Sequence, residues 1–306
     1  MKSFAELEST CSLSFDQSGP FYHLWTPEDH PMIFSNTDLF RAGMSIMAIC
    51  ALLVPQARII TFELMSNHLH ITAAGSEIII MRMFGLFKKY LSRYLKHLGL
   101  AVDLSGFVPQ LRVINSLQDL RNVITYNNRN GYVVNSDYTP FSYPWGANSY
   151  YFNPSAKCSF KESVEKLFRN DRRDLIRSHD SDQLSPIVTV DGYACPMSFC
   201  DIALGERMFR CASHYFREVS RNIESQKKIA EAIGERIFYS DDELFSIVLS
   251  ISNEKYKQPR PSLLPSQAKR DMAIHLHNEY NAGNKQIMRM LKLDLSVVNA
   301  LFPERY

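Results

Sequence analysis

Two histidines separated by one residue, His68 and His70, stand in an apolar, strand-like run, RIITFELMSNHLHITAA at 58–74. In a β-strand, residues two apart point to the same face, so both imidazoles can approach one ion. On a helix the same spacing would turn the two rings roughly 200° apart. Two neutral imidazoles are half of a divalent-metal site, and the pattern predicts metal binding once further ligands are supplied.

A second pair of the same spacing, His275 and His277, is an internal comparison. It lies in the middle of a segment with helical periodicity that begins at Ser266. Because a helix directs the two rings apart, we expect no metal at this pair.

A tyrosine could supply the nucleophile beside the predicted metal. Tyr126 and Asn130 are four residues apart in a segment predicted to be helical, so they share one face. The Tyr126 oxygen could attack a metal-polarised phosphate and form a covalent phosphotyrosine, which keeps the bond energy needed for rejoining. The Asn130 amide oxygen and two imidazoles suit Mg²⁺ or Mn²⁺ and leave positions for the phosphate.

The hydrophobic pattern predicts the elements that must carry these side chains. We expect strands at 21–26, 57–63, 68–74 and 108–114, and helices at 36–53, 77–98 and from the N-cap Ser116 to Gly131. Strands 57–63 and 68–74 form a hairpin. This order predicts an α+β fold in which helices cover an antiparallel sheet.

The remainder of the chain divides by composition. Residues 132–154 are rich in aromatic residues and proline, which predicts an ordered loop around the first domain, and 159–255 is mostly helical in pattern. The segment 257–265, KQPRPSLLP, is linker-like. We therefore predict a catalytic domain at 1–155, a helical extension at 156–256 and a C-terminal unit at 257–306.

The C-terminal unit has the outline of a helix-turn-helix DNA reader. A helix from Ser266 breaks at 281–283 and is followed by a short helix at 284–291 and another from Leu295. The short helix offers three cations to phosphates or base edges, Lys285, Arg289 and Lys292. A structural or oligomerising three-helix bundle has the same pattern, so both interpretations stay open.

Other cations could contact DNA from the first domain. The predicted helix 77–98 carries a basic stripe that could follow a phosphate backbone, made of Arg82, Lys89, Arg93 and Lys96. A solvated helix face would show the same charges. Arg112, in the strand PQLRV, is a further candidate for a phosphate or base contact.

Several motifs together resemble the single-tyrosine transposases of the HUH endonuclease superfamily, most closely the REP-associated tyrosine transposases. The resemblance covers roughly 19–151 and rests on YHLWT, FELMSNHLHI, KKYLSRYLK, PQLRV, ITYNNRNG and YPWGANSY. It implies a ferredoxin-like antiparallel sheet flanked by helices. It also implies a divalent metal held by His68, His70 and the polar Asn130, Tyr126 as the nucleophile, and cleavage and rejoining of single-stranded DNA next to hairpins.

The tyrosine helix admits a second alignment with this family, because Gly131 replaces the proline that usually follows the helix asparagine. In that register Asn128 would match the asparagine and Ile124 the nucleophile, and the tyrosine would be lost. We prefer Tyr126 with Asn130, since both polar groups then keep their spacing.

Two rival nucleophiles, Tyr90 and Tyr94, lie on the predicted helix 77–98. They alternate with apolar residues such as Phe87 and Leu91, a pattern typical of a buried helix face. We therefore expect both to be core or core-edge residues.

Composition sets the outer limits. The 34 Lys and Arg against 32 Asp and Glu give a net charge of +2, too small by itself to indicate a nucleic-acid partner. The six cysteines are irregularly spaced and are expected to be reduced thiols. Without a signal peptide or a long apolar run, we expect a cytoplasmic protein with no membrane contact.

These observations favour a transposase-like DNA endonuclease and strand transferase that acts on single-stranded or hairpin DNA, including REP-like hairpins, through a 5′-phosphotyrosine. The alternative is a domesticated DNA-binding protein of the same fold with weak or no catalysis. A hydrolase acting on another phosphodiester is a third reading and would cleave without a covalent adduct. A monomer and a homodimer are both compatible with the sequence.

Overall fold

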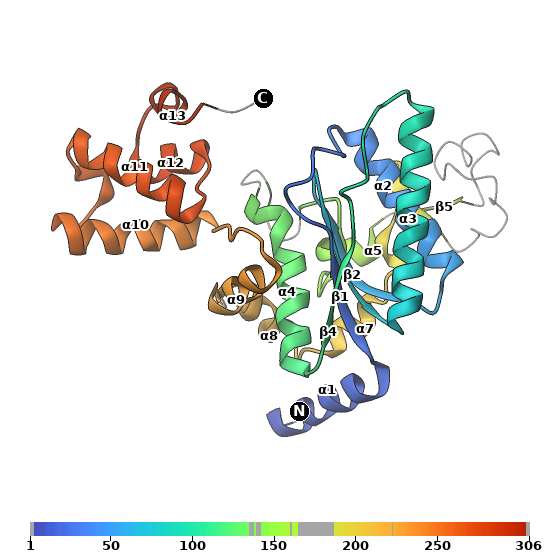
Figure 1. The fold of residues 1–306 in the computed structure, drawn as a ribbon. Coiled ribbons are helices and arrows are strands. Elements are labelled where there is room, and N and C mark those ends of the chain that lie inside the picture. The colour runs from blue at the N-terminus through green and yellow to red at the C-terminus, as the bar shows by residue number, and fades with distance from the viewer. Residues whose placement is uncertain are drawn as a thin grey trace. The chain divides into compact units, whose positions relative to one another are not determined.

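The computed structural model describes residues 3–134, 138, 142–159, 161–164, 187–221 and 223–303. Contacts between residues group the chain into two compact units (Figure 1). Unit 1 comprises Met1–Gly131 and Pro140–Ile229, and unit 2 comprises Tyr132–Thr139 and Ala230–Tyr306. The helical extension predicted for 156–256 is thus divided between the two units.

A four-stranded antiparallel sheet lies at the centre of unit 1 (Figure 1). Its strands are β1 (Phe21–Trp25), β2 (Arg58–Leu64), β3 (Leu69–Ala74) and β4 (Gln110–Ile114), in the order β2-β3-β1-β4. Helix α2 (Thr37–Leu53) connects β1 to β2, and α3 (Glu77–His97) connects β3 to β4. The α+β class and the predicted hairpin of β2 and β3 are confirmed.

Polar residues gather on one face of this sheet. In the strand register, Trp25 and Glu63 lie opposite His70 on its two neighbouring strands, and His23 lies opposite Thr72. Because side chains alternate along a strand, these residues point to the same side. That side faces α4 (Leu117–Val134), where Asn127 donates to the Thr72 hydroxyl at 2.9 Å.

Helices α2 and α3 lie on the opposite side of the sheet from α4 (Figure 1). The Asn36 side chain caps α2 by accepting from the Leu39 N–H at 3.0 Å. Ser116 accepts from the Asp119 N–H at 3.1 Å at the start of α4, as predicted. The sheet and its polar face are therefore enclosed between two helical layers.

Helix α4 does not end at Gly131, as we predicted, but continues to Val134. The Gly131 N–H donates to the Glu63 carboxylate at 2.9 Å, and the Tyr143 ring lies 2.2 Å from where a Cβ would stand. The glycine is required for this close approach rather than for termination of the helix.

Helix α1 (Phe4–Ser18) precedes the sheet and was not predicted. Ser3 and Glu6 form a capping box at its start. The buried Arg121 of α4 donates to both oxygens of Glu8 at 2.9 and 3.1 Å, and to the Met208 carbonyl at 2.6 Å. Side-chain hydrogen bonds therefore join α1 to the rest of unit 1, although Cys11 is the only buried residue of this helix.

The described part of the aromatic segment, 142–154, packs along the edge strand β2. The Tyr143 hydroxyl donates to the Leu64 carbonyl at 2.5 Å, and the Tyr151 hydroxyl donates to the Ile60 carbonyl at 2.9 Å. This agrees with the expected ordered loop; 135–137 and 139–141 lie outside the described residues.

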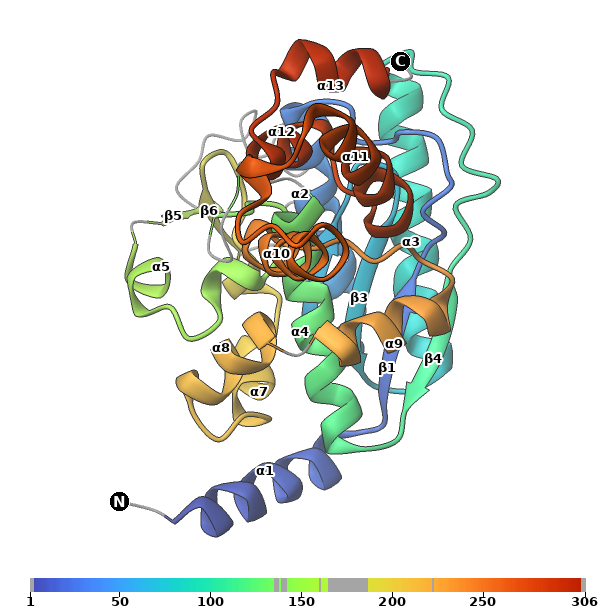
Figure 2. The ribbon, with the colours of Figure 1, turned by 90° about the vertical axis from the view of Figure 1, so that its left-hand side faces the viewer.

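The described part of the extension is not purely helical. Strands β5 (Glu162–Ser163), β6 (Val188–Val190) and β7 (Tyr193–Ala194) form a small antiparallel sheet. The helical elements described between residues 148 and 233 are η1 (Asn148–Tyr150), α5 (Pro154–Cys158), η4 (Pro196–Ser198), α7 (Ile202–Arg207), α8 (Ala212–Arg221) and α9 (Ile223–Ile233). Figures 1 and 2 show α8 beside α4. There the Asn128 amide donates to the Tyr215 hydroxyl at 2.9 Å.

Unit 2 contains α10 (Asp241–Tyr256), η5 (Pro261–Leu263), α11 (Ser266–Tyr280), α12 (Asn284–Leu291) and α13 (Leu295–Leu301). The predicted helix, break and short helix are confirmed. Ile287 and Leu291 of α12 are fully buried. The linker-like segment 257–265 lies inside this unit, with Pro261 buried.

None of the described helices is long and apolar enough to cross a membrane.

Candidate functional site

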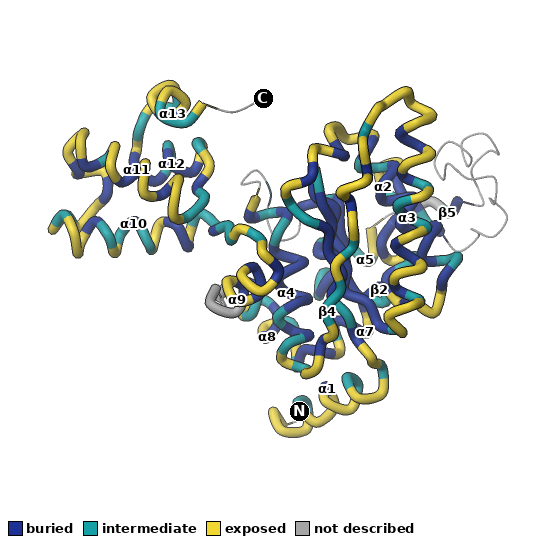
Figure 3. Tube along the Cα trace, in the orientation of Figure 1, coloured by how far each residue is buried: buried dark blue, intermediate teal, exposed yellow. Residues whose placement is uncertain are grey.

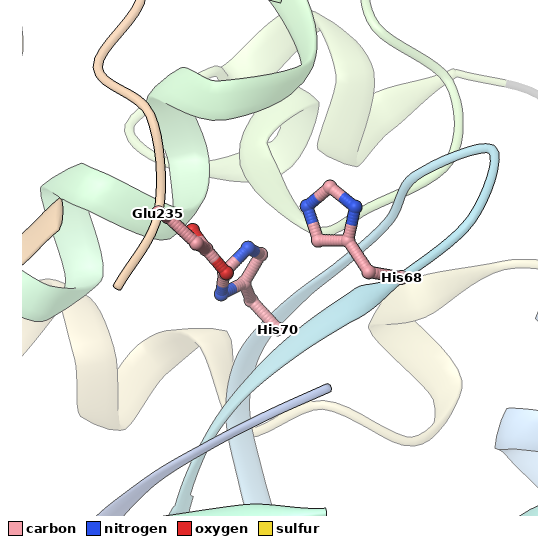
Figure 4. A group of neighbouring side chains, drawn as sticks. All are labelled: His68, His70 and Glu235. Atoms are coloured by element: carbon pink, nitrogen blue, oxygen red, sulfur yellow. The ribbon is translucent and has the colours of Figure 1, made fainter. Parts of the chain in front are cut away.

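The imidazoles of His68 and His70 lie side by side in unit 1. His70 belongs to β3 and His68 immediately precedes it, and their ring centroids are 5.1 Å apart. One ring nitrogen of each lies within 4.8 Å of the other. Figure 4 shows the two imidazoles beside each other on the hairpin of β2 and β3. The predicted pairing of the two rings is therefore present, and their spacing allows them to share a cation.

The loop before β3 orients His68. The Asn67 side-chain oxygen lies 2.8 Å from His68 Nδ1, and the Asn67 amide group donates to the Glu28 carbonyl. Because that amide is committed to a carbonyl, its oxygen faces the imidazole and accepts from Nδ1–H. The neutral ring then carries its lone pair on Nε2, the atom that can bind a cation.

A third histidine, His23 of β1, lies against His70. Its Nε2 is 3.3 Å from His70 Nδ1, and the two ring centroids are 5.6 Å apart. His23 is fully buried. Sequence reasoning did not assign it a role, because one histidine in an apolar strand has no partner until the register of β1 and β3 is known.

Burial keeps these imidazoles neutral. It lowers the pKa of His68 to about 4 and holds the pKa of His70 well below its usual value. Burial, followed by the positive charge of Arg112, lowers the pKa of His23 to about 3, and the Asn127 side chain, which raises the pKa, opposes this effect. Neutral imidazole is the form that binds a metal ion.

Tyr126 of α4 lies beside the histidines. Its ring centroid is 5.7 Å from that of His70 and 6.4 Å from that of His23. The side chain is 4% exposed. Of the two alignments considered for this helix, the one with Tyr126 places a phenol next to the histidine pair.

The other alignment would use Asn128 and Ile124. Asn128 accepts from the Thr61 hydroxyl and donates to Tyr215, so its amide is engaged at β2 and α8. Ile124 is fully buried. These contacts give Asn128 a packing role within unit 1.

Two further polar residues lie on or near this side of the sheet. Asn130 is half-buried, one helical turn after Tyr126. Glu63 is fully buried opposite His70, with one carboxylate oxygen on the Gly131 N–H, and burial raises its pKa well above the usual value. Sequence reasoning missed Glu63, which stands alone among apolar strand residues.

The rival tyrosines lie on α3, across the sheet from α4 (Figure 1). Tyr94 is buried, and Tyr90 packs against a core cluster that includes Ala48 and Ile49 of α2. Both are core or core-edge residues, as predicted.

The predicted DNA contacts differ in their surroundings. The four cations of the α3 stripe are all exposed, namely Arg82, Lys89, Arg93 and Lys96. Figure 3 shows exposed positions recurring along α3. Arg112 instead pairs with Asp119 at 2.9 Å, and Arg289 pairs with Asp241 at 2.7 Å. Lys285 and Lys292 are exposed on and just after α12.

The two rings of the helical pair, His275 and His277, contact different neighbours. The His275 ring contacts Tyr280 with centroids 5.5 Å apart, whereas His277 stacks on Phe302 at 4.1 Å. The two rings have different neighbours, so the H-x-H spacing gathers imidazoles only at β3.

Comparisons of this chain with protein families, with curated proteins and with solved structures find no match.

Proposed function

We propose that this protein is a metal-dependent DNA nuclease and strand transferase of the transposase type, acting on single-stranded or hairpin DNA. The observation that carries the proposal is the position of the Tyr126 ring beside His70, with the His68 imidazole next to it. A phenol beside a pair of neutral imidazoles combines a nucleophile with ligands for a cation.

The connectivity of unit 1 supports the same proposal. A β-α-β-β-α-β order with strands arranged β2-β3-β1-β4 corresponds to the ferredoxin-like arrangement. This is the sheet that the resemblance to HUH endonucleases implies. The histidine pair lies at β3, and the helix that carries Tyr126 follows β4, an order that supports the proposal.

The residues of the site fit a divalent cation. His68 and His70 would hold it through Nε2, and Asn130 is our candidate for an amide oxygen ligand, a set that suits Mn²⁺ or Mg²⁺. When bound, the cation would polarise the scissile phosphate and offset its negative charge.

In the proposed reaction the Tyr126 oxygen attacks the phosphorus of a phosphodiester. The new tyrosine–phosphorus bond retains the DNA 5′-phosphate, and the bond from phosphorus to the 3′ oxygen breaks. The tyrosine proton passes to solvent and the leaving oxygen becomes a 3′-hydroxyl. Attack by a 3′-hydroxyl on the phosphotyrosine reverses the step and rejoins DNA without an external energy source. Because Tyr126 is buried, the substrate reaches it only after local opening.

The burial of Tyr126 also favours a second candidate, a DNA-binding protein of this fold that does not transfer strands. In this reading the exposed cations of α3 and those of α12 bind DNA, and the polar face of the sheet is structural.

The distinguishing experiment incubates the full chain and Mn²⁺ with a labelled single-stranded hairpin DNA. We expect a covalent protein–DNA adduct that resists denaturation, that chelation prevents, and that Tyr126→Phe abolishes while DNA binding persists. Tyr138→Phe is the matched control, since Tyr138 lies in the segment that follows α4. Binding without any adduct would support the second candidate, and cleavage without an adduct would indicate a hydrolase.

A further inference from the structure

The two imidazoles of the candidate site each have a second residue at Nδ1. His68 Nδ1 lies 2.8 Å from the Asn67 oxygen, and His70 Nδ1 lies 3.3 Å from His23 Nε2. The partners come from different elements, the loop before β3 and the neighbouring strand β1. Hydrogen bonds at the non-ligating nitrogen of a histidine fix its tautomer and the orientation of its ring.

The direction of the bond between His23 and His70 follows from the residues behind His23. Asn127 donates its amide to the Thr72 hydroxyl at 2.9 Å, so its oxygen is the group available to His23. The Asn127 side chain raises the pKa of His23, the effect expected of an oxygen that faces the imidazole. Such an oxygen favours a proton on His23 Nδ1, which leaves the lone pair of His23 on Nε2. His70 is then the donor, through Nδ1–H.

We propose that Asn67 and His23 are positioning residues that hold His68 and His70 as Nδ1–H tautomers, so that both Nε2 atoms face one divalent cation. This inference rests on the metal site of the proposed function and names the residues that preorganise it. His23 lies behind His70 and does not bind the cation itself. Behind the site, the hydrogen bond from Asn127 to Thr72 joins α4 to β3, and the contact of His23 with His70 joins β1 to β3.

The tautomers are measurable without any metal. Long-range ¹H–¹⁵N correlation spectra of the metal-free full chain at pH 7 distinguish the two tautomers of a neutral imidazole. We expect the Nδ1–H form at both His68 and His70, and the Nδ1–H form at His23. An Nε2–H form at His68 or His70 would overturn the inference, and this measurement needs no variant to fold.

Variants separate positioning from packing. His23→Leu removes the acceptor and should weaken Mn²⁺ binding about 10- to 100-fold in a calorimetric titration. His23→Gln places an amide oxygen near the position of Nε2 and should restore the affinity. Asn67→Ala should weaken binding in the same way, and Asn67→Asp, which keeps the acceptor, should retain it. His214→Leu removes another buried histidine of unit 1 and is the control for packing.

Variants of the two proposed ligands test the metal site separately from the positioning role. His68→Ala and His70→Ala should each abolish Mn²⁺ binding; binding that survives both changes would contradict the site and the proposed function. If those two variants lose binding but His23→Leu keeps wild-type affinity, the positioning role is wrong while the metal site stands.

Discussion

At the scale of single residues, the chemistry of this chain depends on burial and neighbours more than on spacing. The H-x-H pattern occurs twice, yet only His68 and His70 adjoin each other, because β3 presents alternate residues on one side. Beside them lie a buried carboxyl group, Glu63, and a buried imidazole, His23. Such groups are costly to bury, so they should leave a measurable signature in the pH dependence of stability.

Glu63→Gln should stabilise the protein at neutral pH. Burial raises the folded-state pKa of Glu63 above 4.5, so the stability that this group contributes is full below about pH 4.5 and is lost as pH rises through the folded value. A glutamine carries no such penalty and can still accept from the Gly131 N–H. Denaturant unfolding at pH 7 and pH 4.5 should therefore show a gain that is largest at pH 7.

Asp29→Asn neutralises an exposed carboxylate and is the control for Glu63→Gln. It should not change stability at either pH. A variant Glu63→Gln that is less stable than the wild type at pH 7 would mean that the carboxylate is ionised and paired in the folded protein.

The buried histidines predict the opposite trend at acid pH. The folded-state pKa of His68 is about 4, against 6.5 for an ordinary histidine, so its contribution is present above pH 6.5 and is lost as pH falls towards 4. Each such histidine adds a slope of about 1.4 kcal/mol per pH unit in that window. His68→Gln should reduce the slope of unfolding free energy between pH 6.5 and 4.5.

For this prediction the exposed His275→Gln is the control. An unchanged slope in His68→Gln would show that His68 takes up a proton without unfolding.

The closeness of the His68 and His70 rings was predicted from their spacing in a strand and is confirmed. The structure also places the Tyr126 ring near His70, whereas the roles predicted for these residues remain predictions. His23 and Glu63 were missed because each is a single polar residue in an apolar strand. Only the pairing of β1 and β2 with β3 brings them to His70.

At the scale of elements, α4 determines how Tyr126 meets the sheet. Its start is fixed by the Ser116 cap, and near its end Gly131 allows the Tyr143 ring and the Glu63 carboxylate to approach the backbone. The position of the tyrosine therefore depends on contacts made one helical turn later in the chain.

Replacing Gly131 by alanine should destabilise the protein by about 1–3 kcal/mol, since an added methyl group would overlap the Tyr143 ring. The matched control is Gly85→Ala in the middle of α3, where nothing lies within 4 Å of the new methyl group. There the better helix propensity of alanine should stabilise by roughly 0.5–1 kcal/mol. Equal effects of the two changes in thermal unfolding would contradict the role assigned to Gly131.

The sequence predicted the central elements well because their periodicities are strong and their caps are standard. The four main strands and α2, α3 and α4 agree with the predicted ranges to within a few residues. The predicted end of α4 was wrong because Gly131 was interpreted as the end of the helix, which continues to Val134. Helix α1 was missed because it buries only Cys11 and so lacks a clear apolar face.

At the scale of the whole molecule, the net charge of +2 conceals an uneven distribution. The four cations of the α3 stripe are exposed together, whereas Arg112 and Arg289 are paired with aspartates. Any affinity for DNA phosphates should therefore depend on the exposed groups.

The double change Lys89→Gln and Arg93→Gln should weaken single-stranded DNA binding and lower its salt dependence. Each lost phosphate contact should reduce the slope of log affinity against log salt by about 0.7. Fluorescence anisotropy over a range of salt concentrations measures this slope. Lys227→Gln with Lys228→Gln removes the same charge from the exposed side of α9, and an equal effect of both pairs would indicate bulk charge rather than the stripe.

The division into two compact units was not visible in the sequence. Composition suggested a boundary at 257–265, yet those residues lie within unit 2 together with α10. Units are defined by contacts between residues far apart in the chain, such as those that Arg121 makes with Glu8 and Met208. Composition alone does not show which distant residues are in contact.

In the proposed function, Tyr126 is the nucleophile at a metal held by His68 and His70. The most direct test is mass spectrometry of the peptide that remains attached to DNA after reaction with single-stranded hairpin DNA and Mn²⁺. We expect a 5′-phosphate on Tyr126 that is absent in His68→Ala and in His70→Ala. A phosphate on Tyr90 or Tyr94, or cleaved DNA with no modified tyrosine, would contradict it.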